Sequence, residues 1–189
     1  MGRGRPVHRE LLTRRRRCPV CEPCRVASVF IFRAGAERIP ELEPLWRTLY
    51  DHHVEVGRSV APVREFADSW RRRRGQYQDW LEGDDAVLLI AERARRPIGY
   101  AMVTVGDGPA TWDLGDRTLV IETLAVLPEE RGTGVGHALL EEAERIAREA
   151  DAQTMAVGVL HTNVAARTFY EREAFGLFYV ELVADLREQ

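Results

Sequence analysis

A glycine-dense turn between an apolar strand pattern and a helix pattern most constrains how this chain can fold. The stretch reads Val-Leu-Pro-Glu-Glu-Arg-Gly-Thr-Gly-Val-Gly-His-Ala-Leu-Leu over residues 126–140. The first amides of a helix have no intrahelical partner, and the helix dipole adds partial positive charge there. Glycines at 132, 134 and 136 leave no Cβ in the way of a bulky anion. The turn therefore predicts a binding site for a phosphate-bearing ligand.

Two common phosphate-binding turns do not fit this stretch. A P-loop requires a lysine, and the chain contains none. A dinucleotide fold has Gly-x-Gly-x-x-Gly after its first strand, whereas Gly132, Gly134 and Gly136 follow a tighter spacing late in the chain. The remaining alternative is an ordinary loop before the helix. Three glycines would weaken a helix start, so a ligand at this position explains them better than an ordinary loop does.

The turn also carries a family resemblance. Arg131-x-x-Gly134-x-Gly136 resembles the Arg/Gln-x-x-Gly-x-Gly/Ala signature with which the GNAT superfamily of N-acetyltransferases binds acyl-coenzyme A (acyl-CoA). A second block, Asn-Val-Ala-Ala-Arg-Thr-Phe-Tyr-Glu over 163–171, is similar to that family's later motif. The resemblance covers roughly residues 29–186 and implies acetyl transfer from acetyl-CoA to a primary amine, without a metal. A competing function is a non-catalytic acyl-CoA-binding sensor on the same fold.

Periodicity and the resemblance together predict an α+β fold. Apolar patterns favour strands over 29–34, 86–94, 98–105, 118–127, 154–160 and 179–186, and helices over 40–56, 63–81, 134–150 and 163–172. The two strands at 86–94 and 98–105 form a hairpin whose turn is predicted at residues 95–97. The resemblance implies a GNAT-like mixed, mostly antiparallel central sheet with helices on both faces. Its fourth and fifth strands, 118–127 and 154–160, would splay apart around the pantetheine arm.

The resemblance assigns the coenzyme-binding residues one by one. Backbone groups of three strand residues would meet the pantetheine, and amides of the turn would bind the diphosphate. Asn163 would cap the helix that follows it and hydrogen-bond the coenzyme. The implied set is Leu124, Ala125, Val126, Arg131, Gly132, Thr133, Gly134, Val135, Gly136 and Asn163.

Two residues are candidates for proton transfer. Tyr170 occupies the tyrosine position of the second block and is expected to protonate the departing thiolate. Glu122 lies in a strand otherwise rich in Val, Ile and Leu, and is the candidate base. Simple alternation would place it on the same face as Leu124 and Val126. The alternatives are a Glu122 paired to an arginine, or a water chain as the base. Without a lysine or a Gly-x-Ser-x-Gly elbow, the amine would attack directly in a ternary complex.

Residues 1–28 differ in composition from the rest of the chain. They hold eight arginines against two glutamates, and all three cysteines. Cys18, Cys21 and Cys24 supply only three zinc ligands, with His8 as a poor fourth. We expect residues 1–28 to be a disordered extension and 29–189 to be a single N-acetyltransferase domain.

Composition also bears on partners and location. The remaining chain holds nineteen arginines against 28 acidic residues, which argues against nucleic-acid binding. There is no run of eighteen apolar residues, so no membrane span is expected. A domain body without cysteine is consistent with a cytoplasmic protein. The expected partner is a small-molecule or peptide amine, and a second copy of the chain is a further candidate.

Several segments without a motif are expected to select the acceptor. On the first two helices the candidates are Trp46, Tyr50, His53, Arg58 and Trp70. The arginine run at 71–74 would either contact phosphates or form a solvated helix face. Ala174 stands where the family often has glycine, which predicts that the turn after the last helix shifts to Gly176.

Overall fold

The computed structural model describes residues 28–186, which form two compact units that divide after Gly158. The extension predicted at residues 1–28, with its arginines and cysteines, lies outside these residues except for Ser28. None of the helices described is both long and apolar enough to cross a membrane.

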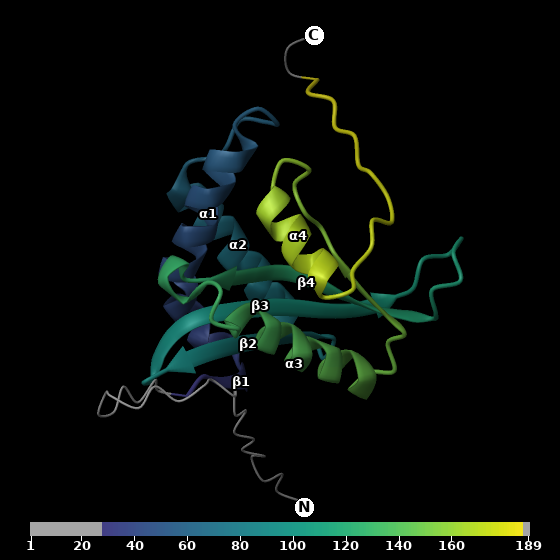
Figure 1. The fold of residues 1–189 in the computed structure, drawn as a ribbon, viewed down its shortest axis with the longest axis horizontal. Helices are drawn as coiled ribbons and strands as arrows, with labels where there is room; N and C mark the ends of the chain where they lie inside the picture. The colour runs from purple at the N-terminus through teal and green to yellow at the C-terminus, as the bar shows by residue number, and fades with distance from the viewer. Residues whose placement is uncertain (1–27, 187–189) are drawn as a thin grey trace, which may run out of the picture. The chain divides into compact units, whose positions relative to one another are not determined.

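The first unit is built on a five-stranded sheet (Figure 1). Its strands follow one another in the order β1 (Phe30–Ala34), β2 (Ala86–Arg93), β3 (Arg96–Asp107), β4 (Arg117–Val126) and β5 (Thr154–Val157). All neighbours are antiparallel except β4 and β5, which run parallel. The predicted mixed, mostly antiparallel sheet is confirmed.

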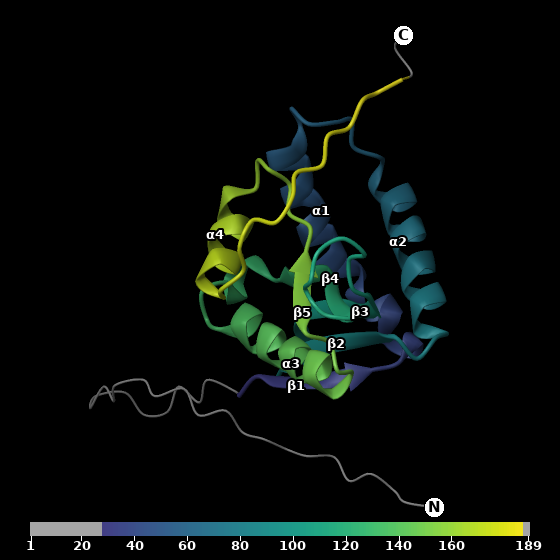
Figure 2. The ribbon, with the colours of Figure 1, turned by 90° about the vertical axis from the view of Figure 1, so that its right-hand side faces the viewer.

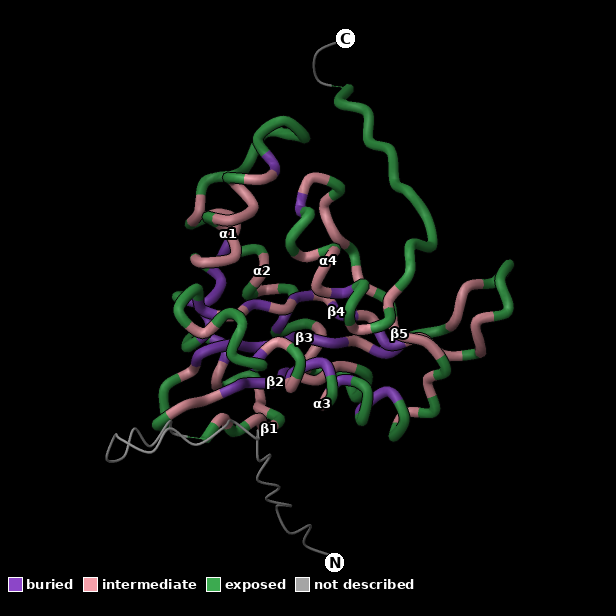
Figure 3. The backbone as a smooth tube through the Cα atoms, in the orientation of Figure 1, coloured by how far each residue is buried: buried purple, intermediate pink, exposed green. Residues whose placement is uncertain are grey.

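Helices cover both faces of this sheet (Figure 2). One face is covered by α1 (Glu43–Gly57), preceded by the 3-10 helix η1 (Ala36–Leu42), and by α2 (Phe66–Leu81). The other face is covered by α3 (Val135–Glu149). The residues that α3 buries against the sheet recur at helical spacing, as predicted, and include Leu139, Leu140, Ala143, Ile146 and Ala147. The core lies between these layers, and Figure 3 shows the central strands as its most buried part.

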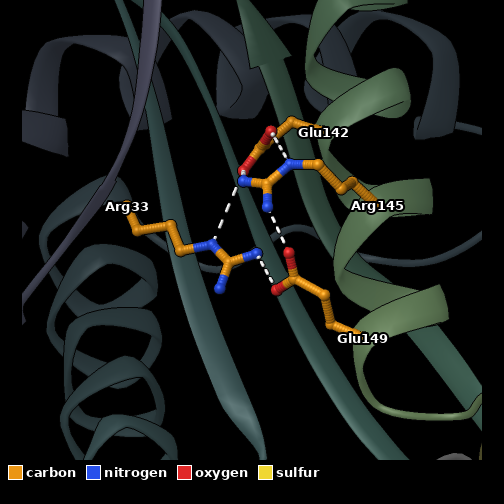
Figure 4. A network of polar contacts seen from close by, with 4 residues as sticks. All are labelled: Arg33, Glu142, Arg145 and Glu149. Atoms are coloured by element: carbon orange, nitrogen blue, oxygen red, sulfur yellow. Dashed lines mark hydrogen bonds and ion pairs between the residues drawn. The ribbon is translucent and has the colours of Figure 1, made fainter. Parts of the chain in front are cut away.

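Ion pairs join α3 to the edge strand β1 (Figure 4). Arg33 Nη2 lies 2.5 Å from Glu149 Oε2, and Arg33 Nε lies 3.5 Å from Glu142 Oε1. Arg145 pairs with both glutamates. The hydrogen bond from Arg33 lowers the pKa of the Glu149 carboxyl. Arg33, Arg145 and Glu149 are exposed, so these ion pairs contribute little to the stability of the fold.

The hairpin between β2 and β3 turns one residue earlier than predicted. Arg93 pairs with Arg96, which leaves Ala94 and Arg95 as a two-residue turn. Both have positive φ, 51° and 63°, as the mirror-image turn of a tight hairpin requires. Sequence interpretation placed the turn at residues 95–97, but Arg96 and Pro97 are already part of β3.

In the second unit, α4 (Val164–Arg172) forms where it was predicted, but the final strand does not. Asn163 caps α4 by accepting a hydrogen bond from the Ala166 amide at 3.1 Å. Residues 173–186 contain no helix or strand, and Leu182 is 91% exposed. The prediction of a strand over 179–186 is therefore wrong, because β-branched and aromatic residues form a strand only where a neighbouring strand takes their hydrogen bonds.

The turn after α4 is centred on Ala174, not on Gly176 as predicted. Ala174 has φ of 66°, its amide donates to the Glu171 carbonyl, and the Phe175 amide donates to the Tyr170 carbonyl at 3.0 Å. These two bonds form a Schellman motif, which requires a left-handed residue at this position whether or not it is glycine.

Replacing Ala174 by glycine is expected to stabilise the protein by about 0.5–1 kcal/mol, because glycine adopts the left-handed conformation without strain. Ala165→Gly in the right-handed α4 is the matched control and is expected to change stability in the opposite direction. Urea unfolding of both variants measures this. An Ala174→Gly protein no more stable than the parent would contradict the assignment.

Candidate functional site

The glycine turn forms as the sequence predicts. A short 3-10 helix, η2 (Pro128–Glu130), leads into Arg131, and α3 begins at Val135. Gly132 and Gly134 have φ of 72° and 95°, a conformation that residues with a side chain rarely adopt. A Cβ built on either glycine meets nothing within 4 Å. These two glycines are therefore required by backbone conformation, not by crowding from the protein itself.

The start of α3 presents amides toward this turn. The first bond of the helix runs from the Ala138 amide to the Gly134 carbonyl, at 3.0 Å. The amides of Val135, Gly136 and His137 lie before that bond, where the helix dipole is positive. Gly132, Thr133 and Gly134 are exposed, so an anion can reach this end of the helix. The residues present fit the diphosphate of a coenzyme.

A glycine of β3, Gly99, lets α3 approach the sheet. A Cβ on Gly99 would lie 3.0 Å from the Ala125 carbonyl oxygen and 3.2 Å from Val135 Cγ1. Because Gly99 pairs with Val126 at the end of β4, its small size keeps the start of α3 beside that end. The Arg131 guanidinium lies there too, with Nε 3.4 Å from the Val126 carbonyl oxygen.

Strands β4 and β5 part before β4 ends. Their pairing runs only from Thr118 with Thr154 to Ile121 with Val157, and β5 ends there, three residues earlier than predicted. Within the described residues, no strand pairs with residues 122–126 on the β5 side. Leu124, Ala125 and Val126 therefore lie along a strand edge open to a ligand's hydrogen bonds. This is the predicted splay of the fourth and fifth strands.

Glu122 lies at a β-bulge where the pairing with β5 stops. On the other side of β4, Met102 pairs with Thr123 and Val103 with Ile121, so Glu122 is an extra residue without a partner. A bulge bends a strand and redirects its side chain. The predicted common face with Leu124 and Val126 is therefore wrong. The carboxylate reaches Thr104 on the α1/α2 side, where the Thr104 hydroxyl donates to it at 2.9 Å.

The surroundings of Glu122 contain hydroxyl groups. Tyr77 of α2 donates to Thr123 Oγ1 at 2.7 Å, and its oxygen lies 3.1 Å from that of Tyr100. Burial raises the pKa of both phenols, so both stay neutral at physiological pH. Within residues 28–186 no arginine pairs with Glu122, so the described part of the chain supplies no salt bridge to this carboxylate. Sequence interpretation missed Thr104 and Tyr77 because neither belongs to a motif.

Tyr170, in the second unit, is a buried phenol at the end of α4. Its ring packs edge-on against Phe169 and Phe175, with centroids 5.1 and 5.4 Å away. Burial raises the pKa of Tyr170 to about 12. The hydroxyl therefore remains a proton donor throughout the physiological pH range. Asn163, the predicted coenzyme contact, is buried at the other end of the same helix.

The candidate acceptor residues lie in different environments. Trp46 and Trp70 are buried, Tyr50 donates to the Arg64 carbonyl oxygen, and Arg58 is exposed. Burial, with smaller contributions from His52 and Arg73, lowers the pKa of His53. Near pH 7 His53 is therefore a neutral imidazole.

Known proteins share this sequence pattern and fold. The profile of the Acetyltransferase (GNAT) family matches residues 46–176. An uncharacterized N-acetyltransferase from Archaeoglobus fulgidus is 30% identical over 115 residues, covering 59% of this chain and 76% of that protein.

Solved structures agree on the fold. The aminoglycoside N-acetyltransferase AAC(6')-Iy, solved in complex with CoA, is similar with a TM-score of 0.69 and 16% identity, over 88% of this chain and 99% of that one. A predicted acetyltransferase from Clostridium acetobutylicum, solved with acetyl-CoA, gives 0.66 and 20% identity, over 85% and 98%. With the family profile matching more than half of its length, the chain belongs to the GNAT family and is an acetyltransferase.

Proposed function

We propose that the protein transfers an acetyl group from acetyl-CoA to a primary amine by direct attack in a ternary complex. The observation that carries this proposal is the junction of two features at the end of β4. The strand edge at residues 124–126 is open, and the exposed glycine turn that leads into α3 follows it within ten residues. The open strand edge suits the amide groups of the pantetheine arm, and the glycine turn at the start of α3 suits the diphosphate.

The chain supplies groups for each proton transfer. The Glu122 carboxylate would take a proton from the incoming ammonium, and the amine nitrogen would then attack the thioester carbon. As the C–N bond forms and the C–S bond breaks, a strand amide near Val126 would stabilise the negative oxygen. The Tyr170 hydroxyl would protonate the departing thiolate, and the second proton that the attacking nitrogen loses would restore the phenol. Because the phenol stays neutral below about pH 11, it is available as a donor.

A panel of amines incubated with the protein and acetyl-CoA tests this function. We expect mass spectrometry to find an acetylated product for at least one class among amino acids, polyamines, aminoglycosides and peptide amino termini. Acetyl-CoA binding without any acetylated amine would instead favour a sensor.

Replacing Gly134 by alanine is expected to raise the Kd for acetyl-CoA about 10-fold, because a side chain disfavours the left-handed conformation that aims the first amides of α3. Isothermal calorimetry measures this Kd.

Gly75→Ala is the matched control for this variant. Gly75 lies in α2 with open space around its built Cβ, so alanine should leave coenzyme affinity unchanged. Equal affinities for the two variants would contradict a role of the turn in binding.

A further inference from the structure

The arginine run on α2 does not form one solvated face. Arg71 and Arg72 pair with Asp68, and Arg74 is exposed. Arg73, by contrast, turns toward α1 and is half-buried. Its Cζ lies 5.1 Å from the ring centroid of Trp46 and 5.8 Å from that of Tyr77.

Arg73 lacks a counter-ion in the described part of the chain. No carboxylate of residues 28–186 forms an ion pair with it, and Asp68 on the same helix pairs instead with Arg64, Arg71 and Arg72. A guanidinium that is partly removed from water without an anion is unfavourable. Arg73 is therefore suited to bind an anionic group from outside the protein.

The residue beside Arg73 has an unsatisfied donor of its own. Trp46 is only 5% exposed, and its indole Nε1 has no hydrogen-bond acceptor within residues 28–186. Buried indole N–H groups in proteins ordinarily have a partner. An oxygen of a bound anion would satisfy this donor and the guanidinium together.

The neighbouring imidazole does not compete for this anion. Burial, His52 and Arg73 lower the pKa of His53, so it is neutral near pH 7. Among these side chains Arg73 alone carries a positive charge at that pH.

A negative group lies on the same side of the sheet. Glu122 accepts a hydrogen bond from Thr104 there. The charge of Arg73 lowers the pKa of the Tyr77 hydroxyl and the charge of Glu122 raises it, so both charges lie near this phenol. They nevertheless form no ion pair with each other among the contacts of the described chain. Two opposite charges near one phenol, held apart, are complementary to a ligand that carries both an ammonium and an anion.

We propose that the acceptor is a small amine that also bears a carboxylate, such as an amino acid, with its carboxylate on Arg73 and Trp46 Nε1 and its amine toward Glu122. This inference rests on the proposed function, because it concerns the acceptor of that reaction. Arg73 and Trp46 act as specificity determinants and take no part in the chemical step.

The test compares amino acids with the corresponding amines that lack the carboxylate. With the parent protein, kcat/KM for the carboxylate-bearing member of each pair should be at least about 10-fold higher. Arg73→Gln should remove most of that preference through KM and leave the decarboxylated amine unaffected. Trp46→Phe, which keeps the ring and loses the N–H, should reduce the preference less.

Arg74→Gln is the matched control, since it removes an exposed arginine from the adjacent position and should change neither substrate. Equal kcat/KM within each pair, or an Arg73→Gln variant that slows both members alike, would overturn the proposal.

Calorimetric titration of the same amines into the protein with CoA separates the two claims. If no amine is acetylated but amino acids still bind in an Arg73-dependent way, the anion site stands and the proposed reaction fails. If amino acids bind no better than their decarboxylated partners, the anion site is wrong whatever the turnover.

Discussion

Replacing Tyr170 by phenylalanine is expected to lower kcat about 100-fold, the usual contribution of a positioned proton donor. The KM for acetyl-CoA should change less than about threefold, because the ring and its packing on Phe169 and Phe175 remain. Burial raises the pKa of this phenol to about 12, so the parent should keep its proton donor well above pH 10. Steady-state kinetics with a saturating amine measure both constants.

Tyr179→Phe is the matched control for this experiment. Tyr179 is 70% exposed and lies outside any helix or strand, so losing its hydroxyl should leave kcat unchanged. A Tyr170→Phe protein with the parent's kcat for its best amine would reject the assignment of Tyr170 as the acid.

Replacing Glu122 by glutamine is also expected to lower kcat/KM for the amine about 100-fold at neutral pH. Glutamine retains an oxygen that can accept from Thr104, so the bulge should persist while the base is lost. Steady-state kinetics at saturating acetyl-CoA measure this loss.

Glu144→Gln on the exposed face of α3 controls for a general effect of charge removal. Its kcat/KM should match the parent's. A Glu122→Gln protein with the parent's kcat/KM would mean that water, and not this carboxylate, accepts the proton first.

The donor side of the site could be predicted in some detail because its signals are local. Positive φ at Gly132 and Gly134, and the apolar stripe of α3, follow from conformational freedom and helical spacing over a few residues. Asn163 likewise caps α4 through a bond that spans only three residues. Such features depend little on the rest of the chain.

Two errors arose where long-range pairing decides the outcome. Alternation placed Glu122 with Leu124, but a bulge set by the register of β3 against β4 turns it to the other face. The apolar sequence of 179–186 has strand character, yet no strand pairs with it among the described residues. Arg73 and Trp46 meet across two helices, a contact that no local pattern contains.

The most direct test of the account follows free CoA thiol and N-acetylated product together, with acetyl-CoA and the best amine of the panel. We predict that thiol and product form in equal amounts, and that thiol release without amine is at least about 100-fold slower. Thiol release that does not depend on the amine, or tight acetyl-CoA binding with no thiol release, would contradict acetyl transfer to an amine.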